Sequence, residues 1–360
     1  MGGFQATFGS SLVFLVLYLP ANAKVGEVFS DVLKFFSPLT LLPYLIESKF
    51  LWSVDLFHTE ADFQLKALHN WQWFNIHIGL TFLGTLSFIV ASYLVGSGWL
   101  WQLLERSFRN PQITVLSKAQ SYGMSACVAI LFLGYVFKGQ PNVEQSYYFS
   151  GWLPHQLQSL LSWYLIGGLA LIGALLPQRQ ACIDWARCRY IQPKHRKTLW
   201  EDLLWGEKSP ATLAIALNLI ILHIPLVVWV MCWPTQSDRT TAILGIGINA
   251  SLIWLYACIA QVLLLMKTPK RGIWAMGSVI GAIALPPAML LVLAIKPEEI
   301  PALWLFAPLS WSALDYASLL MVFVSAIAQG GLIGLLNLEL TRQLHQAGES
   351  ASKALLAPIR

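Results

Sequence analysis

The sequence has few charged residues. Asp, Glu, Lys and Arg make up 11% of it, whereas a typical soluble domain contains about 25%. Hydrophobic residues make up 56%, and several apolar runs exceed the roughly 18 residues that a membrane-spanning helix needs. The runs are continuous rather than alternating, which favours helices over the strands of a membrane barrel. The composition therefore excludes an ordinary soluble domain and predicts an all-α integral membrane protein. The net charge of +5 sits in a few loops and gives little support for nucleic-acid binding.

The common catalytic and metal-binding motifs are also missing. The sequence contains no G-x-x-x-x-G-K-[ST], H-E-x-x-H or G-x-S-x-G, so it offers no P-loop and neither of these hydrolase motifs. None of the five cysteines forms a Cys-x-x-Cys pair, which leaves no zinc or redox motif. We therefore predict that this chain is not an enzyme and holds no metal or cofactor of its own.

A third absence concerns the expected membrane spans. The last six of them contain essentially no Asp, Glu, Lys or Arg in their interiors, and Asp315 stands at a helix edge. Ion-coupled carriers usually keep such groups inside the membrane, so the energy for any transport should come from another subunit. His77 and His223 are candidate substrate ligands at membrane depth, although a helix–helix hydrogen bond explains each of them as well. Pro225 and the pair Pro286-Pro287 should kink their spans, and these kinks either serve a possible conduit or adjust the helix packing.

The apolar runs predict about eight transmembrane helices. The first is a run from Phe8 to Leu19. Ala21-x-Ala23 after it resembles a signal-peptidase site, but residues 1–10 lack the Lys or Arg of a signal peptide, so a retained helix is favoured over a cleaved one. The second is a long helix from Trp71 to Leu104. The other six are Tyr122–Phe137, Leu157–Leu176, Ala211–Cys232, Thr241–Met266, Gly272–Ile295 and Leu314–Leu336.

Two short apolar segments are too short to span and contain prolines. One carries Pro38 and Pro43, and the other carries Pro308. We predict that both are re-entrant or interfacial segments on the outer face. The sequence Phe-Ser-Pro-Leu-Thr at 36–40 is echoed by Phe-Ala-Pro-Leu-Ser at 306–310, which suggests an internal repeat of the kind common in transporters.

Basic and non-basic connections alternate along the chain. The basic ones are 105–121, 178–210, 267–271 and the tail, whereas 138–154, 233–240 and 296–313 carry no such excess. Cytoplasmic loops are enriched in Lys and Arg, so the C-terminus is predicted to be cytoplasmic. The expected organisation is the end of a first membrane module at 1–109, a complete six-helix module at 110–340 and a tail at 341–360.

The loop 178–210 is the longest polar interval between two apolar segments. It contains seven of the 23 Lys and Arg residues. One helical face carries Cys182, Ile183, Ala186 and Tyr190, with Arg187 and Arg189 off it. Apolar residues from Leu199 to Leu204 recur at i, i+1, i+4 and i+5. This periodicity predicts two short amphipathic helices that rest on lipid headgroups or dock into a partner.

Several stretches resemble a known family. They are Gly2-Gly3-Phe4-Gln5-Ala6, Phe36-Ser37-Pro38-Leu39, Leu42-Pro43-Tyr44-Leu45-Ile46, Leu116-Ser117-Lys118-Ala119-Gln120-Ser121-Tyr122, Lys208-Ser209-Pro210-Ala211, Thr341-Arg342-Gln343-Leu344 and the stretch from Ala347 to Leu356. With them the chain resembles the membrane subunits of ABC exporters of the type-two permease class, in particular a cyanobacterial set. The resemblance covers most of the chain, but none of the stretches is a catalytic motif.

The resemblance implies a six-helix module in the bacterial plasma membrane. Trp99–Arg109 would be its leading amphipathic helix, and 301–312 its outer re-entrant segment. The loop 178–210 would be the coupling loop to a nucleotide-binding subunit, which would bind ATP and magnesium. The residues expected at that contact are Trp185, Arg187, Arg189, Trp200, Leu203 and Leu204.

One departure from the family pattern leaves other functions open. Relatives look like two fused modules, whereas this chain is expected to begin inside the first. A separate N-terminal module or a second permease chain would then be a further partner. A non-transporting membrane scaffold or regulatory fragment is the alternative function. A membrane-embedded lipid enzyme is disfavoured, because no His, Asp or Glu residues cluster at the expected interfaces.

Overall fold

The computed structural model describes residues 114–136, 152–191, 199–233, 237–308 and 312–356, together with 72–73, 76–77 and scattered positions from 90 to 106. The chain divides into two compact units, Met1–Pro111 and Gln112–Arg360. The predicted first span and the segment with Pro38 and Pro43 lie outside the described residues.

The first unit corrects one prediction. Strands β1 (Gln72–Trp73) and β2 (Ile76–His77) pair in antiparallel register, so the long helix predicted from Trp71 does not begin there. Aromatic and β-branched residues such as Trp73 and Ile76 favour strands, and hydropathy alone does not separate the two conformations. The described positions from 90 to 106 are helical, and they include part of the predicted amphipathic helix Trp99–Arg109.

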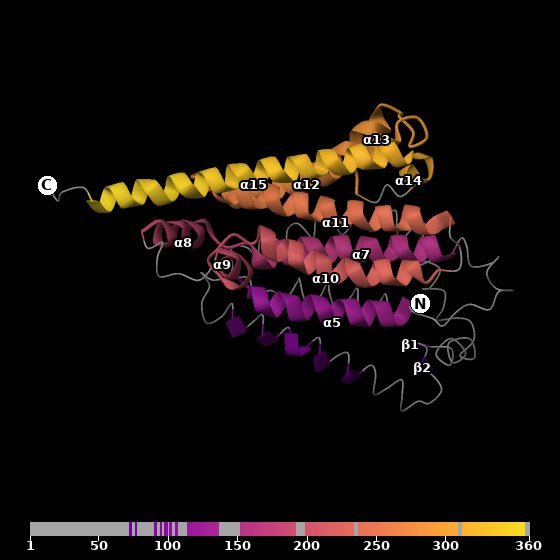
Figure 1. The fold of residues 1–360 in the computed structure, drawn as a ribbon, viewed down its shortest axis with the longest axis horizontal. Helices are drawn as coiled ribbons and strands as arrows, with labels where there is room; N and C mark the ends of the chain where they lie inside the picture. The colour runs from indigo at the N-terminus through magenta and orange to yellow at the C-terminus, as the bar shows by residue number, and fades with distance from the viewer. Residues whose placement is uncertain are drawn as a thin grey trace, which may run out of the picture. The chain divides into compact units, whose positions relative to one another are not determined.

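The described part of the second unit consists of helices and the turns between them (Figure 1). Its long helices are α5 (Lys118–Val136), α7 (Trp152–Leu175), α10 (Thr212–Met231), α11 (Ser237–Leu264), α12 (Arg271–Val292) and α15 (Leu319–Leu356). Its short helices are α8 (Arg179–Ile191), α9 (Leu199–Trp205), α13 (Pro301–Trp304) and α14 (Ser312–Tyr316).

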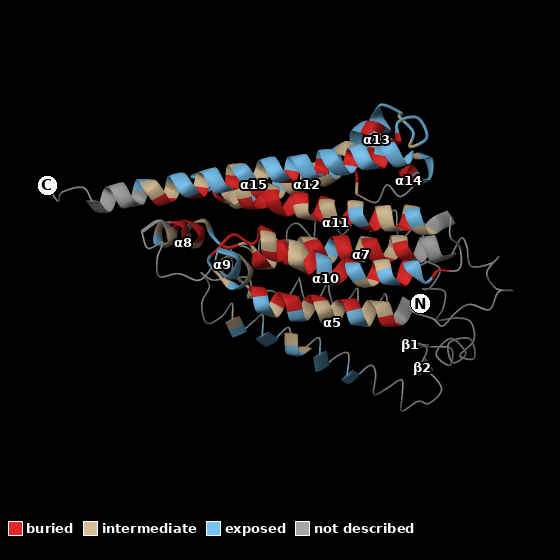
Figure 2. Cartoon of the chain, viewed as in Figure 1, coloured by how far each residue is buried: buried red, intermediate tan, exposed pale blue. Residues whose placement is uncertain are grey.

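Helix α11 lies at the centre of this bundle. It packs against α7, α10, α12 and α15, and 61% of its most apolar stretch is buried. The corresponding shares are 11% in α12 and 22% in α15. Figure 2 shows exposed residues along most of α15 and buried ones along α11. Apolar side chains that face outward, such as Leu320, Phe323 and Val324, are typical of a helix surrounded by lipid.

Five described helices are long and apolar enough to cross a membrane. They are the stretches Leu157–Leu175, Thr212–Met231, Arg239–Leu264, Arg271–Val292 and Leu319–Ser350. Helix α5 occupies the position of a sixth predicted span. The predicted helical architecture is therefore confirmed for the described part of the second unit, with five helices that are compatible with membrane spans, and the count of eight spans stays a prediction.

The last helix differs from the predicted span Leu314–Leu336 at both ends. It begins only at Leu319, because the Ser318 hydroxyl accepts a hydrogen bond from the Met321 N–H and caps a new helix. It continues through the predicted tail to Leu356, with Leu340 and Leu344 buried against α8. The apolar run predicted only the part of this helix that would lie in the membrane. Packing of Leu340 and Leu344 against α8 extends the helix beyond that part.

Buried amides connect the long helices. Asn218 on α10 donates to Ser121 Oγ on α5, and Ser125 Oγ donates to Asn218 Oδ1.

A second set of polar contacts joins α11 to α15. Ser251 of α11 donates to the Gln329 side chain of α15. Gln329 in turn donates to the Leu305 carbonyl after α13, at 3.0 Å. Apolar helix surfaces slide past one another easily in lipid, so such bonds set the register of the bundle.

We expect Asn218→Ala to destabilise the bundle by about 1–2 kcal/mol, because it leaves the buried hydroxyls of Ser121 and Ser125 without their shared partner. The free energy of unfolding in mixed detergent measures the effect. The matched control is Ile220→Ala, an exposed position on the same helix, which should change stability by less than about 0.5 kcal/mol. Equal losses in the two variants would contradict the register role of Asn218.

Candidate functional site

Helix α8 is amphipathic, as its sequence predicts. Cys182, Ile183 and Ala186 are buried, whereas Arg187 and Arg189 lie at the partly exposed side. Cys182 and Ala186 pack with Leu265 of the segment after α11 and with Leu340 and Leu344 of α15. Arg179 Nε also donates to the Leu265 carbonyl, at 2.9 Å. The loop 178–210 therefore begins against one end of the bundle rather than away from it.

Helix α9 is the unusual element, because it buries none of its residues. Leu203 and Leu204 are half-buried, whereas Leu199, Trp200 and Trp205 are exposed. Trp200 leaves 65% of its surface uncovered. An isolated seven-residue helix is unstable in water, so contacts to the rest of the bundle must hold α9 in place.

Lys118 is the main contact. Its ammonium is buried, with 2% of the residue exposed. It donates to the Leu203 carbonyl at 2.7 Å, to Ser209 Oγ at 2.6 Å and to the Pro210 carbonyl at 3.0 Å. Carbonyls near a helix C-terminus carry partial negative charge, and a lysine ammonium has three donors. One side chain from the start of α5 thus anchors both α9 and the turn that follows it.

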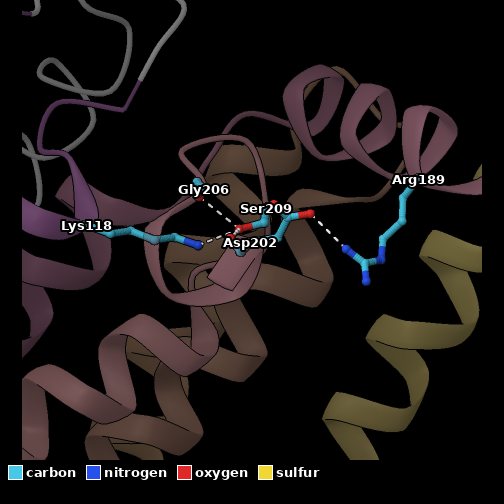
Figure 3. A network of polar contacts seen from close by, with 5 residues as sticks. All are labelled: Lys118, Arg189, Asp202, Gly206 and Ser209. Atoms are coloured by element: carbon cyan, nitrogen blue, oxygen red, sulfur yellow. Dashed lines mark hydrogen bonds and ion pairs between the residues drawn. The ribbon is translucent and has the colours of Figure 1, made fainter. Parts of the chain in front are cut away.

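Ser209 and Asp202 extend this network (Figure 3). The Ser209 hydroxyl lies 2.5 Å from the Asp202 carbonyl and 2.8 Å from the Gly206 carbonyl. The Asp202 side chain accepts a hydrogen bond from Arg189 Nη1 of α8, at 2.8 Å. Figure 3 shows Lys118 and Arg189 approaching the Asp202–Ser209 segment from opposite sides. Helix α9 is therefore tied to α5 on one side and to α8 on the other.

Aromatic contacts complete the site. The Tyr122 hydroxyl of α5 donates to the Leu204 carbonyl at 2.7 Å, and the Tyr122 and Trp205 rings meet edge to face. On α8, the Arg189 guanidinium lies 5.8 Å from the centre of the Trp185 ring, within the range of a cation–π contact. The two Tyr122 contacts hold the C-terminal half of α9, and Trp200 takes part in neither of them.

Burial lowers the pKa of the Lys118 ammonium to about 7, and the nearby acidic groups of Cys182 and Asp202 oppose this shift. Burial also raises the pKa of the Cys182 thiol to about 12. Lys118 can therefore release its proton near neutral pH. A neutral amine keeps two N–H donors for the three acceptors around it, and it removes the cost of a buried charge.

The other predicted site residues lie apart from this network. Pro308 follows α13 in a turn next to buried Leu305 and Ala307, at the opposite end of α11 from Leu265. Whether the segment 301–312 re-enters the membrane stays a prediction. Its described part is the short helix α13 followed by a turn at 305–308, and α14 begins at its last residue, Ser312.

The possible conduit residues lie on two helices, His223 and Pro225 on α10 and Pro286 on α12, and their role in a conduit stays a prediction. His223 is buried, and its ring nitrogens lie 2.8 Å from the Leu219 carbonyl and 3.1 Å from Asn249 Oδ1 of α11. This geometry fits the helix–helix bond that was the alternative role for His223. Pro225 lies in the same helix. Pro286 instead lines an open groove on α12 that includes neither of these two residues.

Lys118, Tyr122 and Ser209 were not among the predicted contact residues. They do lie in two of the stretches that carry the family resemblance, 116–122 and 208–211. The structure shows that these stretches, about 90 positions apart in the chain, meet at the Lys118–Ser209 hydrogen bond. No protein-family model, characterised protein or solved structure matches the chain.

We expect Lys118→Met to change the pH dependence of stability. The folded-state pKa of about 7 lies below the ordinary 10.5, so between these values the unfolded chain binds more protons and stability rises with pH. The melting temperature of the detergent-solubilised protein from pH 7 to 9 should therefore rise more steeply in the wild type than in the variant. Lys208→Met, at an exposed position, should keep the wild-type slope. Parallel profiles for all three proteins would refute the lowered pKa.

We expect Gly206→Ala to loosen the turn after α9. A Cβ at Gly206 would collide with the backbone carbonyl oxygen of Asp202, so the turn must shift and strain the Ser209 bonds. Trypsin cleavage after exposed Lys208 should become several-fold faster. Gly247→Ala is the control, because a Cβ there meets no atom within 4 Å. An unchanged cleavage rate in the Gly206 variant would show that the turn adapts without loosening.

Proposed function

We propose that this chain is the permease subunit of an ATP-driven ABC exporter of the type-two class. A separate nucleotide-binding subunit docks on α9 and the adjoining side of α8. That subunit binds ATP and magnesium and hydrolyses the ATP. The end of the bundle that carries α8 and α9 then faces the bacterial cytoplasm, together with the C-terminal end of α15. The chain itself supplies the membrane passage and no catalytic residue.

The main support for this proposal is the combination of an exposed apolar surface and a buried polar anchor at α9. A helix that merely rests on lipid headgroups needs an apolar face but no fixed attachment to the bundle. Helix α9 has fixed attachments through Lys118, Tyr122 and Arg189. Its Trp200 nevertheless points away from them and stays exposed. Exposed aromatic side chains on a rigid support are typical of protein-binding sites.

The same contacts suggest how force reaches the membrane helices. A partner that moves α9 also moves the start of α5 through Lys118 and Tyr122. Movement of α8 reaches α11 and α15 through Arg179 and the cluster around Cys182. The near absence of Asp, Glu, Lys and Arg from the interiors of the last six predicted spans supports an external energy source and an apolar cargo.

The test is co-purification of the full chain with a nucleotide-binding subunit encoded beside it. Trp200→Ala should weaken the association by about 30-fold, as expected when a binding hot spot of about 2 kcal/mol is removed. The matched control is Trp274→Ala on α12, where the tryptophan is similarly exposed at 59%. This control should retain the partner.

Two results would contradict the proposal. One is retention of the ATPase by the Trp200 variant at the wild-type level, which would remove α9 from the contact. The other is an absence of co-purification with the wild-type chain, which would favour the non-transporting scaffold.

A further inference from the structure

Helix α12 has an open groove along its exposed side. The groove has a volume of about 720 Å³ and extends from Lys270 past Trp274 to Pro286. At 1.5 Å per residue this is about 24 Å of helix. One leaflet of a bilayer, with its headgroup layer, is about 20–22 Å thick. The groove therefore has the length of one lipid molecule that stands parallel to the helix.

Small residues keep the groove open. Gly277 and Gly281 lie one turn apart on its floor. A Cβ at Gly277 would meet no atom within 4 Å, and one at Gly281 would touch only the Leu285 side chain. Ile273 and Leu285 add apolar walls. An extended acyl chain fits such a surface, because methylene groups can approach the bare helix backbone closely.

The groove is basic at one end. Lys270 is part of its lining, and Lys267 and Arg271 are its neighbours in the turn between α11 and α12. None of the three forms an ion pair within the described residues. The sequence from Arg239 to Pro297 contains no Asp or Glu. Trp274, one turn further on, is exposed, as tryptophans at a membrane interface commonly are.

We infer that the α12 groove binds one anionic phospholipid, with the headgroup phosphate at Lys270 and an acyl chain along Gly277 and Gly281. Basic pockets beside membrane helices recognise anionic headgroups in this way. A second copy of the chain fits the groove less well. Two copies related by an axis along the membrane normal would bring their basic turns to the same end, where like charges repel.

The experiment is native mass spectrometry of the purified full chain, titrated with dioleoylphosphatidylglycerol or with dioleoylphosphatidylcholine. We expect the wild type to bind the anionic lipid at least tenfold more tightly. Lys270→Gln should reduce this preference at least fivefold. Lys267→Gln, which changes a lysine outside the groove lining, should keep it within twofold.

A second pair of variants tests the acyl-chain site. Gly277→Leu places a side chain in open space, so the fold should accept it while the groove is filled. Binding of both lipids should fall at least tenfold. Gly247→Leu is the matched control, at an exposed glycine of α11 that also has free space around it, and it should bind lipid as the wild type does.

Three outcomes would overturn the inference. Equal affinity for the two lipids would show that the headgroup is not recognised. Equal losses from Lys267→Gln and Lys270→Gln would show diffuse attraction to a charged turn. A dimer that dissociates in Gly277→Leu, with lipid binding unchanged, would assign the groove to a second copy of the chain.

Discussion

The buried ammonium of Lys118 is the interaction on which the arrangement of this end of the bundle depends. A charged lysine is costly to remove from water, and here its three donors meet three oxygen acceptors from α9 and the turn after it. The cost of burial appears as a lowered pKa, and the gain is a fixed position for a helix that buries none of its own residues. Without this anchor, α9 has too few residues to persist as a helix.

Hydrogen bonds between amides and hydroxyls have a comparable role inside the bundle. Asn218, Gln329 and His223 each join neighbouring helices, where apolar packing alone would leave the register undefined. His223 is buried in this role, with its Nε2 next to Asn249 Oδ1 of α11. The absence of acidic and basic groups from the predicted span interiors then leaves these neutral polar groups as the means of specifying the fold.

The described part of the second unit leaves two kinds of surface uncovered. One is the apolar side of α9, which is small, rigid and supported by charged residues. The other is the outward side of α12 and α15, which has the breadth expected of a lipid-facing surface. The two differ in chemistry, because Trp200 projects from a polar setting whereas Gly277 and Gly281 open a cleft in an apolar one. We propose a protein partner for the first surface and a lipid for the second.

Composition and periodicity were enough to predict much of the fold. Low charge and long apolar runs predicted membrane helices, and the spans from α5 to α12 begin and end within a few residues of their predicted positions. The faces of α8 followed from the spacing of Cys182, Ile183 and Ala186. Hydropathy was wrong at β1 and β2 and at both ends of the last span, where strand pairing, the Ser318 cap and packing against α8 determine the structure. These depend on contacts that no local pattern records.

Some features of the candidate site could likewise be predicted from the sequence, and others could not. The sequence by itself determined that the loop 178–210 is basic and amphipathic, because charge and helical period are properties of neighbouring residues. Only the tertiary structure decided that Lys118 and Ser209 meet, that Trp200 stays exposed while Trp185 packs inward, and that Pro286 lines a groove apart from His223. Each of these depends on which helices lie side by side, and a hydrogen bond between residues about 90 positions apart exists only once the bundle has folded.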